Sequence, residues 1–262
     1  MNNSSHKIAD KNQEIFLSVI IPSYNEKKNF GRGVLTKVAD YLAKQKYAYE
    51  VILSDDGSTD GTLEILRKFA SEHKHFRVLA NAHAGKGPTV TAGMLAAAGQ
   101  WRLFTDFDQS TPLSEVEKLF PSTIDHAIVI GSRAVAGAKR EKEPWYRHVM
   151  GFGFNILTRM IVLPGILDSQ CGFKLFSQKA TQKIFPQLYI YSSRGGVKDA
   201  FTGAFDVELL FLARKNKIAV AEIPVLWQHA QSDRVSPVKD SLRMLRDIIR
   251  IRLASWRGQY EK

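Results

Sequence analysis

The amino-acid sequence predicts an α/β domain in which a mainly parallel β-sheet carries helices on both faces. Short apolar runs rich in β-branched residues alternate with longer segments whose apolar residues recur at helical spacing. The chain has 262 residues, 44% of them apolar, which suits one domain with a sizeable core better than two. We find no internal repeat and no low-complexity linker. Right-handed βαβ units account for such an alternation.

The elements follow in a regular order. The first strand, over 17–21, reads LSVII and stops at Pro22, which is typical of a buried parallel strand. A helix is predicted over 29–45, where Val34, Leu35, Val38 and Leu42 share one face. Next come a strand over 50–53, a helix through Leu63, Leu66 and Phe69, a strand over 76–79, a helix over 88–98, a strand over 101–105 and a fifth strand over 127–130.

Polar clusters follow these strands, at the edge of a parallel sheet where ligands bind. The first cluster is Pro22-Ser23-Tyr24-Asn25-Glu26. It offers an aromatic ring and a carboxylate where a nucleobase and a ribose could be held. An ordinary strand-to-helix turn is an equally good interpretation of this pentapeptide.

The second cluster, over 55–62, reads DDGSTDGT. Gly57 permits a tight turn, and Ser58 or Thr59 with Asp60 can cap the next helix. Capping does not explain two consecutive carboxylates, one of which could accept the imino hydrogen of uracil or guanine. The Gly-rich fingerprint of dinucleotide-binding proteins is absent.

The third cluster, Gly85-Lys86-Gly87, places a point charge for a phosphate between two glycines. It lacks the spacing of a P-loop, which argues against an ATPase.

The fourth cluster is Thr105-Asp106-Phe107-Asp108, directly after a strand. Asp106 and Asp108 can engage one hard cation between them, and Mg²⁺ and Mn²⁺ prefer oxygen ligands that include substrate phosphates. A solvated turn is the common alternative for an isolated pair, but the register with the other clusters favours a metal site.

In this order and spacing, IIPSYNE, DDGSTDGT, GKG and TDFD resemble family 2 glycosyltransferases, which have the GT-A fold. The segments GSR, DSQCGFK, FDVELL and SPVKD further along the chain are similar to polyprenyl-phosphate sugar synthases. Dolichyl-phosphate glucosyltransferases are the most similar group, and dolichyl-phosphate mannose synthases are close behind. The similarity covers roughly residues 17–260.

The resemblance implies a role for each matching residue. Pro22, Tyr24 and Glu26 would line the nucleoside site, and Asp55 would read the base. Asp106 and Asp108 would hold Mg²⁺ or Mn²⁺ on the donor diphosphate, near Lys86. Arg133 and Arg147 would bind the acceptor phosphate, and Arg234 would approach the donor diphosphate. Asp206 and Glu208 would contact sugar hydroxyls or, if the acceptor were a hydroxyl, act as the general base. Helix-start electrostatics is the alternative for this last pair.

The sequence departs from the family pattern at two places. In the mannose synthases a Gln two places after the second Asp can join the metal, whereas here Gln109 follows at once and Ser110 takes that place. Gly203 stands where the family commonly has Trp.

The implied reaction moves a hexose, with inversion, from a nucleotide-diphosphate sugar to a polyprenyl or dolichyl phosphate, and UDP-glucose is the expected donor. A prenyl phosphate is already an anionic nucleophile, so no general base is required. The open alternatives are GDP-mannose as donor, a hydroxyl acceptor, and nucleotidyl transfer. A nucleic-acid-binding domain is disfavoured because carboxylates occupy the strand-end loops.

We expect a loose tail over 1–15, a GT-A domain over 16–233 and a basic amphipathic helix over 234–262. The net charge is +11, and eight Lys and Arg against three acidic residues lie from Arg234 onward. Apolar and basic stripes run side by side along this helix: Val238, Leu242, Leu245, Ile249, Leu253 and Trp256 beside Lys239, Arg243, Arg246, Arg250 and Arg257.

Such a helix suits the headgroup region of an anionic membrane, and a helix packed on its own domain is an equal alternative. With a lone cysteine, Cys171, and no stretch long enough to span a bilayer, we expect a cytoplasmic protein, peripheral on the cytoplasmic face of a membrane. The sequence does not fix the oligomeric state.

Overall fold

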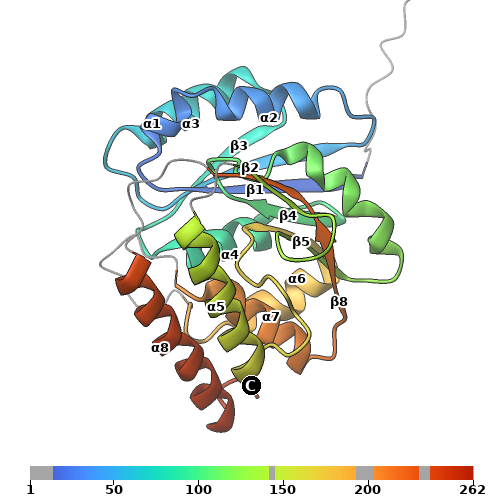
Figure 1. The fold of residues 1–262 in the computed structure, drawn as a ribbon. Coiled ribbons are helices and arrows are strands. Elements are labelled where there is room, and N and C mark those ends of the chain that lie inside the picture. Colours follow the sequence, from blue (N-terminus) through green and yellow to red (C-terminus); the bar gives the residue numbers. More distant parts are fainter. Residues whose placement is uncertain (1–13, 142–144, 193–202, 230–236, 262) are drawn as a thin grey trace, which may run out of the picture.

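The described strands form a central sheet of seven, in the order β3-β2-β1-β4-β7-β5-β8 (Figure 1). This computed structural model describes residues 14–141, 145–192, 203–229 and 237–261, with the backbone alone over 145–152 and 237–241. The strands are β1 (Leu17–Ser23), β2 (Tyr49–Asp55), β3 (Phe76–Ala80), β4 (Trp101–Thr105), β5 (Ile128–Ser132), β7 (Phe173–Ser177) and β8 (Val220–Pro224); β6 (Lys139–Glu141) and β9 (Leu226–Gln228) pair separately.

The predicted mainly parallel sheet is confirmed. β1 pairs in parallel with β2 and β4, β2 with β3, and β5 with β8. β7 runs antiparallel between β4 and β5. The sequence pattern did not predict β7, whose second residue, Lys174, is a fully buried lysine.

Helices cover both faces of the sheet, as predicted. α1 (Lys27–Phe30), α2 (Val34–Leu42) and α3 (Thr62–Glu72) lie on one face, and α4 (Lys86–Ala96), α5 (Trp145–Ile161), α6 (Gln178–Ile184), α7 (Phe205–Lys215) and α8 (Pro237–Trp256) lie on the other (Figure 1). Short 3₁₀ turns are η1 (Leu113–Lys118), η2 (Phe120–Ile124) and η3 (Phe185–Gln187).

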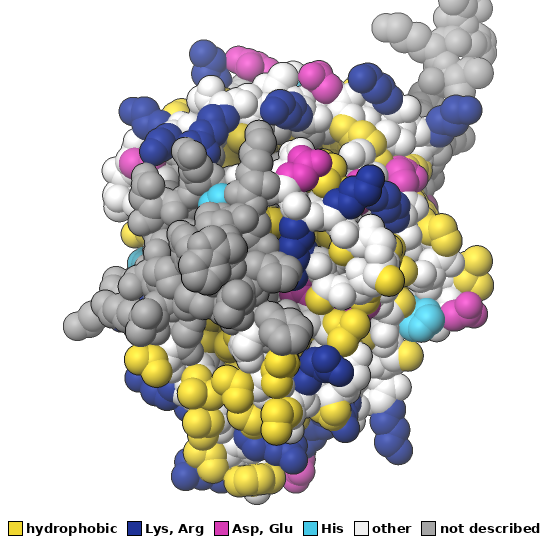
Figure 2. All heavy atoms as spheres, viewed as in Figure 1, with side chains coloured by type: hydrophobic (Ala, Val, Ile, Leu, Met, Phe, Trp, Pro, Cys, Tyr) yellow, Lys and Arg dark blue, Asp and Glu magenta, His cyan; other side chains and the backbone are white. Residues whose placement is uncertain are grey.

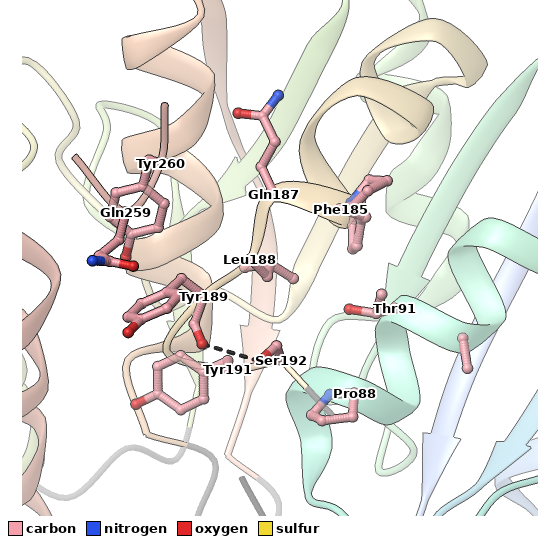
Figure 3. Close-up of a pocket in the computed structure, with 12 residues that line it drawn as sticks. Pro88, Thr91, Phe185, Gln187, Leu188, Tyr189, Tyr191, Ser192, Gln259 and Tyr260 are labelled. Carbon is pink, nitrogen blue, oxygen red and sulfur yellow. Dashed lines mark hydrogen bonds between the residues drawn. The ribbon is translucent and has the colours of Figure 1, made fainter. Parts of the chain in front are cut away.

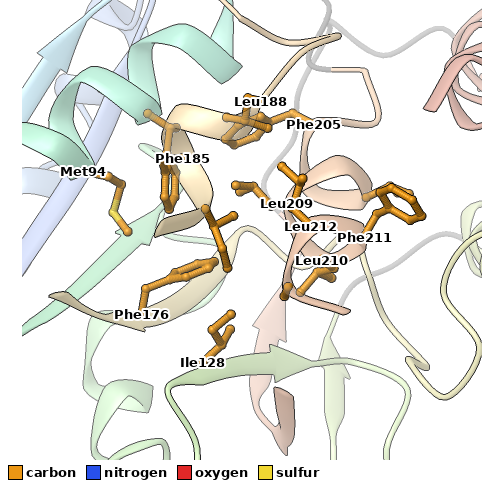
Figure 4. Close-up of a cluster of buried hydrophobic side chains, with 14 of the residues drawn as sticks. Met94, Ile128, Phe176, Phe185, Leu188, Phe205, Leu209, Leu210, Phe211 and Leu212 are labelled. Atoms are coloured by element: carbon orange, nitrogen blue, oxygen red, sulfur yellow. The ribbon is translucent and has the colours of Figure 1, made fainter. Parts of the chain in front are cut away.

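Each face buries its own hydrophobic core, because successive strand residues point to opposite sides. In β1, Val19 and Ile21 pack toward α2 and α3, whereas Ile20 packs toward α4. The core on the face covered by α4 and α7 is called the second core. Figure 4 shows it, with Phe176 of β7 and Phe205 of α7 packed against side chains of α4 and η3.

Two predicted helices differ in outcome. The helix expected over 29–45 is divided into α1 and α2, because Gly33 adopts the left-handed conformation (φ 70°) between them. The C-terminal helix is present as α8, which packs on α5 and α7 and adds Ile248 and Ile251 to the second core. None of the helices in the described ranges has the length and apolar character needed to cross a membrane.

Candidate active site

The predicted polar clusters meet at one edge of the sheet. β1, β2 and β4 are parallel neighbours, so their carboxyl ends at Ser23, Asp55 and Thr105 lie together. The loops that follow are hydrogen-bonded to one another: the backbone N–H of Asn25 donates to Ser58 Oγ at 2.9 Å. The structure therefore joins the first, second and fourth clusters into one site.

Asp55, the predicted base-reading residue, is fully buried at the end of β2. Its Oδ1 accepts the hydroxyl of Ser58 at 2.6 Å, and its Oδ2 accepts the Ser58 backbone N–H at 2.9 Å. The carboxylate thus shapes the turn after β2, and its contact with a base stays a prediction.

Asp56 shapes the third cluster. Its carboxylate is buried and accepts the backbone N–H groups of Ala84 and Gly85 at 2.9 and 3.0 Å. It also lies 2.9 Å from His83 Nδ1. Asp56 therefore fixes the loop that leads into Lys86, a role that sequence reasoning missed. The signal was there, since helix capping left one of the paired aspartates unexplained.

An aromatic pair lies above the end of β1. The rings of Tyr24 and His83 stack with centroids 4.3 Å apart and an interplanar angle of 15°. Pro22 and Glu26 are half-buried beside them in the chain, and Glu26 accepts the side-chain amide of Asn29 at 2.5 Å. The three predicted nucleoside residues thus lie together, and His83 joins them although no motif contains it.

Lys86 faces the aspartates that follow β4. Its Nζ donates to Asp106 Oδ1 at 2.6 Å. Burial lowers the pKa of the Lys86 ammonium, but the charges of Asp106, Asp206 and Asp108 more than reverse this, so the net shift is upward. Lys86 of the third cluster therefore places a protonated ammonium group beside the carboxylates of the fourth.

Asp106 and Asp108 fit a divalent cation. Burial and the charge of Asp106 raise the pKa of Asp108, so these carboxylates repel each other and a cation between them would relieve the repulsion. Gly172 makes room for the pair, since a Cβ there would collide with the carboxylate of Asp106. No group of three or more His, Cys, Asp or Glu able to hold a metal occurs within the described residues. Mg²⁺ commonly completes its ligand shell with substrate phosphate oxygens and water.

Asp206 lies in the first turn of α7 and forms a buried ion pair with Lys174 of β7 at 2.5 Å. Lys174 Nζ also donates to the carbonyl of Cys171 at 2.5 Å and stands 5.5 Å from the centroid of the Phe104 ring. This lysine gives the predicted sugar-binding carboxylate a fixed partner. The segment DSQCGFK, which contains Lys174, contributed to the predicted family resemblance, but no role was predicted for the lysine itself.

Glu208 is a fully buried anchor rather than a group open to a ligand. Its oxygens accept the backbone N–H groups of Tyr189, Ile190 and Tyr191 at 2.8–3.0 Å and the hydroxyl of Tyr260 at 2.7 Å. It therefore ties α7 to the segment before it and to the residues that follow α8.

Arg133 is engaged by Asp168, which is fully buried. Arg133 Nε and Nη2 donate to the two oxygens of Asp168 at 2.7 and 2.8 Å, and its guanidinium lies 5.4 Å from the centroid of the Trp227 ring. Burial alone would raise the pKa of Asp168, but the charge and hydrogen bonds of Arg133 hold it well below its usual range. An acceptor phosphate at Arg133 would therefore meet a guanidinium that is already paired with Asp168.

Two predicted arginines fall partly or wholly outside the described residues. Arg147 belongs to α5, but its side chain lies outside the described part of the chain, and Arg234 lies outside it altogether. Cys171 is fully packed, and burial raises the pKa of its thiol to about 11, so it is not a reactive thiolate at neutral pH.

Comparisons with known proteins agree with this geometry. The sequence profile of Glycosyl transferase family 2 matches residues 18–185. The dolichyl-phosphate β-glucosyltransferase of Saccharomyces cerevisiae is 36% identical over 272 residues, which cover 95% of this chain and 77% of that protein. The human dolichyl-phosphate β-glucosyltransferase is 33% identical over 260 residues, covering 93% and 77%.

Among solved structures, glucosyl-3-phosphoglycerate synthase from Mycobacterium tuberculosis, in complex with Mn²⁺, UDP and glucosyl-3-phosphoglycerate, has a TM-score of 0.60 at 19% identity. The match covers 92% of this chain and 79% of that one and supports the shared fold.

The sheet and the strand-end site therefore define a glycosyltransferase of the GT-A type. The chain belongs to Glycosyl transferase family 2. The predicted resemblance to dolichyl-phosphate glucosyltransferases is confirmed.

Proposed function

We propose that this enzyme transfers glucose from UDP-glucose to dolichyl phosphate or another polyprenyl phosphate. The observation that carries the proposal is the contact of Lys86 with Asp106 beside Asp108, in a chain that matches dolichyl-phosphate β-glucosyltransferases over more than nine-tenths of its length. Such a cluster suits a donor diphosphate, which needs cations around it as it leaves.

The residues divide the work between donor and acceptor. Pro22, Tyr24, Glu26 and Asp55 hold the nucleoside, and Lys86 and Arg234 neutralise the diphosphate. Asp106 and Asp108 hold Mg²⁺ or Mn²⁺, which when bound stabilises the developing charge of the leaving diphosphate.

Arg133 and Arg147 orient the acceptor phosphate, whose oxygen attacks the anomeric carbon from the side opposite the diphosphate. An α-linked donor then gives a β-linked product. Asp206, held by Lys174, accepts hydrogen bonds from sugar hydroxyls; no proton need be removed from the acceptor.

We also propose that α5 and α8 contact a membrane surface. On α8, Leu242, Ile249, Leu253 and Trp256 are exposed, whereas Ile248, Ile251 and Ala254 are buried. Ile156, Leu157 and Met160 of α5 are exposed as well. Figure 2 shows apolar side chains gathered over this part of the molecule, with basic ones around them. α8 thus packs on its domain with one face and offers another to lipid.

A water-insoluble acceptor makes such a surface useful, because the enzyme must meet its phosphate at the headgroups. The exposed apolar side chains and the neighbouring arginines support peripheral binding to an anionic leaflet, which we assign to the cytoplasmic face.

Donor choice tests the proposal. The purified enzyme is incubated with a prenyl phosphate and either UDP-glucose, GDP-mannose or UDP-N-acetylglucosamine, with Mn²⁺, Mg²⁺ or a chelator. We expect a glycolipid from UDP-glucose alone and none with the chelator. A mannolipid from GDP-mannose as the main product would refute the donor assignment, and transfer to a hydroxyl acceptor alone would refute the acceptor.

A further inference from the structure

Tyr191 connects three segments that lie far apart in the sequence. Its Oη donates to the carboxylate of Asp247 in α8 and accepts the backbone N–H of Ala204 at 2.6 Å. Its own backbone N–H donates to Glu208 Oε2 at 3.0 Å. Burial and the hydrogen bond to Asp247 raise the pKa of the phenol, so it stays protonated and keeps both bonds. The side chain is therefore fixed at both of its ends.

The chain before α7 is fitted to this phenol. Gly203 has a φ of +56°, and a Cβ on it would collide with Tyr191 Oη. Ala204, which follows, is fully buried and donates to the same oxygen. Asp206 is only two residues further on, in the first turn of α7. The position of the phenol thus determines how the chain enters the helix that carries Asp206.

The other side of Tyr191 contacts the first turn of α4, which begins at Lys86. A Cβ on Gly87 would lie 3.0 Å from Tyr191 Cβ and 3.0 Å from Phe205 Cδ2. Figure 3 shows Tyr191 and Pro88, at the start of α4, on the wall of a cavity of about 620 Å³ that Tyr260 also lines. Tyr191 therefore lies between the start of α4, which carries Lys86, and the entry to α7, which carries Asp206.

Asp247 extends this contact to the membrane-facing helix. Its side chain is buried on the inner face of α8, where Oδ1 also accepts Arg250 Nη1 at 3.1 Å. Leu242 and Ile249, five residues before and two after it, are exposed. A shift of α8 relative to the domain would thus displace the carboxylate to which Tyr191 Oη donates.

We infer that Tyr191 is a positioning residue through which α8 sets the orientation of Asp206. The kinetic part of this inference rests on the proposed function; the structural part does not. The Tyr191–Asp247 pair holds the entry to α7 in the arrangement that transfer requires. Displacement of α8 slows transfer, although every group that touches substrate is still present.

The experiment compares the full chain with Tyr191→Phe, with Asp247→Leu, which removes both acceptor oxygens, and with the double variant. Tyr189→Phe is the matched control, since the Tyr189 hydroxyl has no hydrogen-bond partner among the described residues. Hydrogen–deuterium exchange is followed over the segment that begins at residue 203. We expect faster exchange there in Tyr191→Phe and in Asp247→Leu but not in Tyr189→Phe. Unchanged exchange in both variants would overturn the inference, whatever the enzyme proves to transfer.

Steady-state kinetics with UDP-glucose and a short, soluble prenyl phosphate supply the second readout. We expect kcat per folded molecule to fall about tenfold in Tyr191→Phe, with both KM values changed less than about threefold. The double variant should be no slower than Tyr191→Phe, because each single change removes the same hydrogen bond, the one between Tyr191 and Asp247. A kcat equal to wild type, or additive effects, would overturn the inference. If Tyr191→Phe does not fold, Asp247→Leu, which keeps the tyrosine ring, is measured in its place with the same expected outcomes.

Discussion

Asp106 and Asp108 lie directly after the end of β4. Asp106 pairs with Lys86, the first residue of α4. The sequence predicted the aspartate pair because Asp-x-Asp at a strand end is a local pattern. It offered Lys86 as a phosphate ligand, and the structure adds that this lysine already neutralises Asp106. Pairing between residues 20 apart follows from the fold, and no local pattern reports it.

Asp108→Asn tests the metal assignment. Asparagine can still accept the backbone N–H of Ser110, which Asp108 Oδ1 accepts at 2.9 Å, so the fold should persist. Loss of one anionic ligand should lower transfer by on the order of 100-fold or more at saturating Mn²⁺. Asp125→Asn, at an exposed aspartate of the η2–β5 turn, is the control. Near-normal turnover in Asp108→Asn would show that this carboxylate does not hold the ion.

Arg133→Ala separates a structural from a substrate role. Asp168 would be left buried without its partner, so the free energy of unfolding should fall by about 3–5 kcal/mol in urea titration. Unchanged stability with a raised KM for the lipid phosphate alone would instead make Arg133 a pure substrate ligand.

The same ion pair has a definite pH dependence. Because the pKa of Asp168 is lower in the folded than in the unfolded state, its contribution is complete above the unfolded value of about 4 and is lost as the pH falls below it. Asp168→Asn should therefore flatten the acid limb of the stability profile, and an unaltered limb would contradict the ion-pair account.

At the scale of elements, strands and helices with strong periodicity were predictable and β7 was not. β7 begins directly after Gly172 and contains the buried Lys174, so its sequence lacks the apolar run that marks β1. Pairing with β4 and β5 makes it a strand, and the carboxylate of Asp206 together with the carbonyl of Cys171 makes its buried lysine tolerable in the core. The division of the helix after β1 was equally hidden, because the apolar spacing continues across Gly33.

α8 was predicted from its stripes, but the two interpretations of it were not alternatives. Arg250 of the basic stripe is exposed and pairs with the buried Asp247, and Arg246 is exposed as well. The helix is thus a part of the domain that also keeps an exposed apolar face, the surface that we propose for lipid.

Vesicle binding tests this surface. Ile249→Ser with Trp256→Ser should lower partition onto anionic vesicles at low salt by roughly tenfold or more, since both side chains would leave the apolar boundary. Ile124→Ser, at an exposed isoleucine outside α5 and α8, should have no effect. Binding should weaken with added salt, because each nearby Lys or Arg contributes on the order of 1 kcal/mol. Equal binding by all three proteins would assign α8 to the domain alone.

For the molecule as a whole, the parallel half of the sheet carries most of the residues that we propose for the donor, and helices of the opposite face carry those that we propose for the sugar and the membrane surface. β1, β2 and β4 present Tyr24, Asp55 and Asp106 at one edge. α7 carries Asp206, α8 carries part of the exposed apolar surface, and Tyr191 links the entry to α7 with Asp247 of α8.

The anomeric configuration of the product tests the central claim most directly. Wild-type enzyme is supplied with UDP-glucose labelled in the sugar, dolichyl phosphate and Mn²⁺, and the glucolipid is isolated and its anomeric centre assigned by NMR. Direct attack by the lipid phosphate predicts a β-linked glucosyl phosphate. An α-linked product, or glucose released to water without any lipid product, would contradict it.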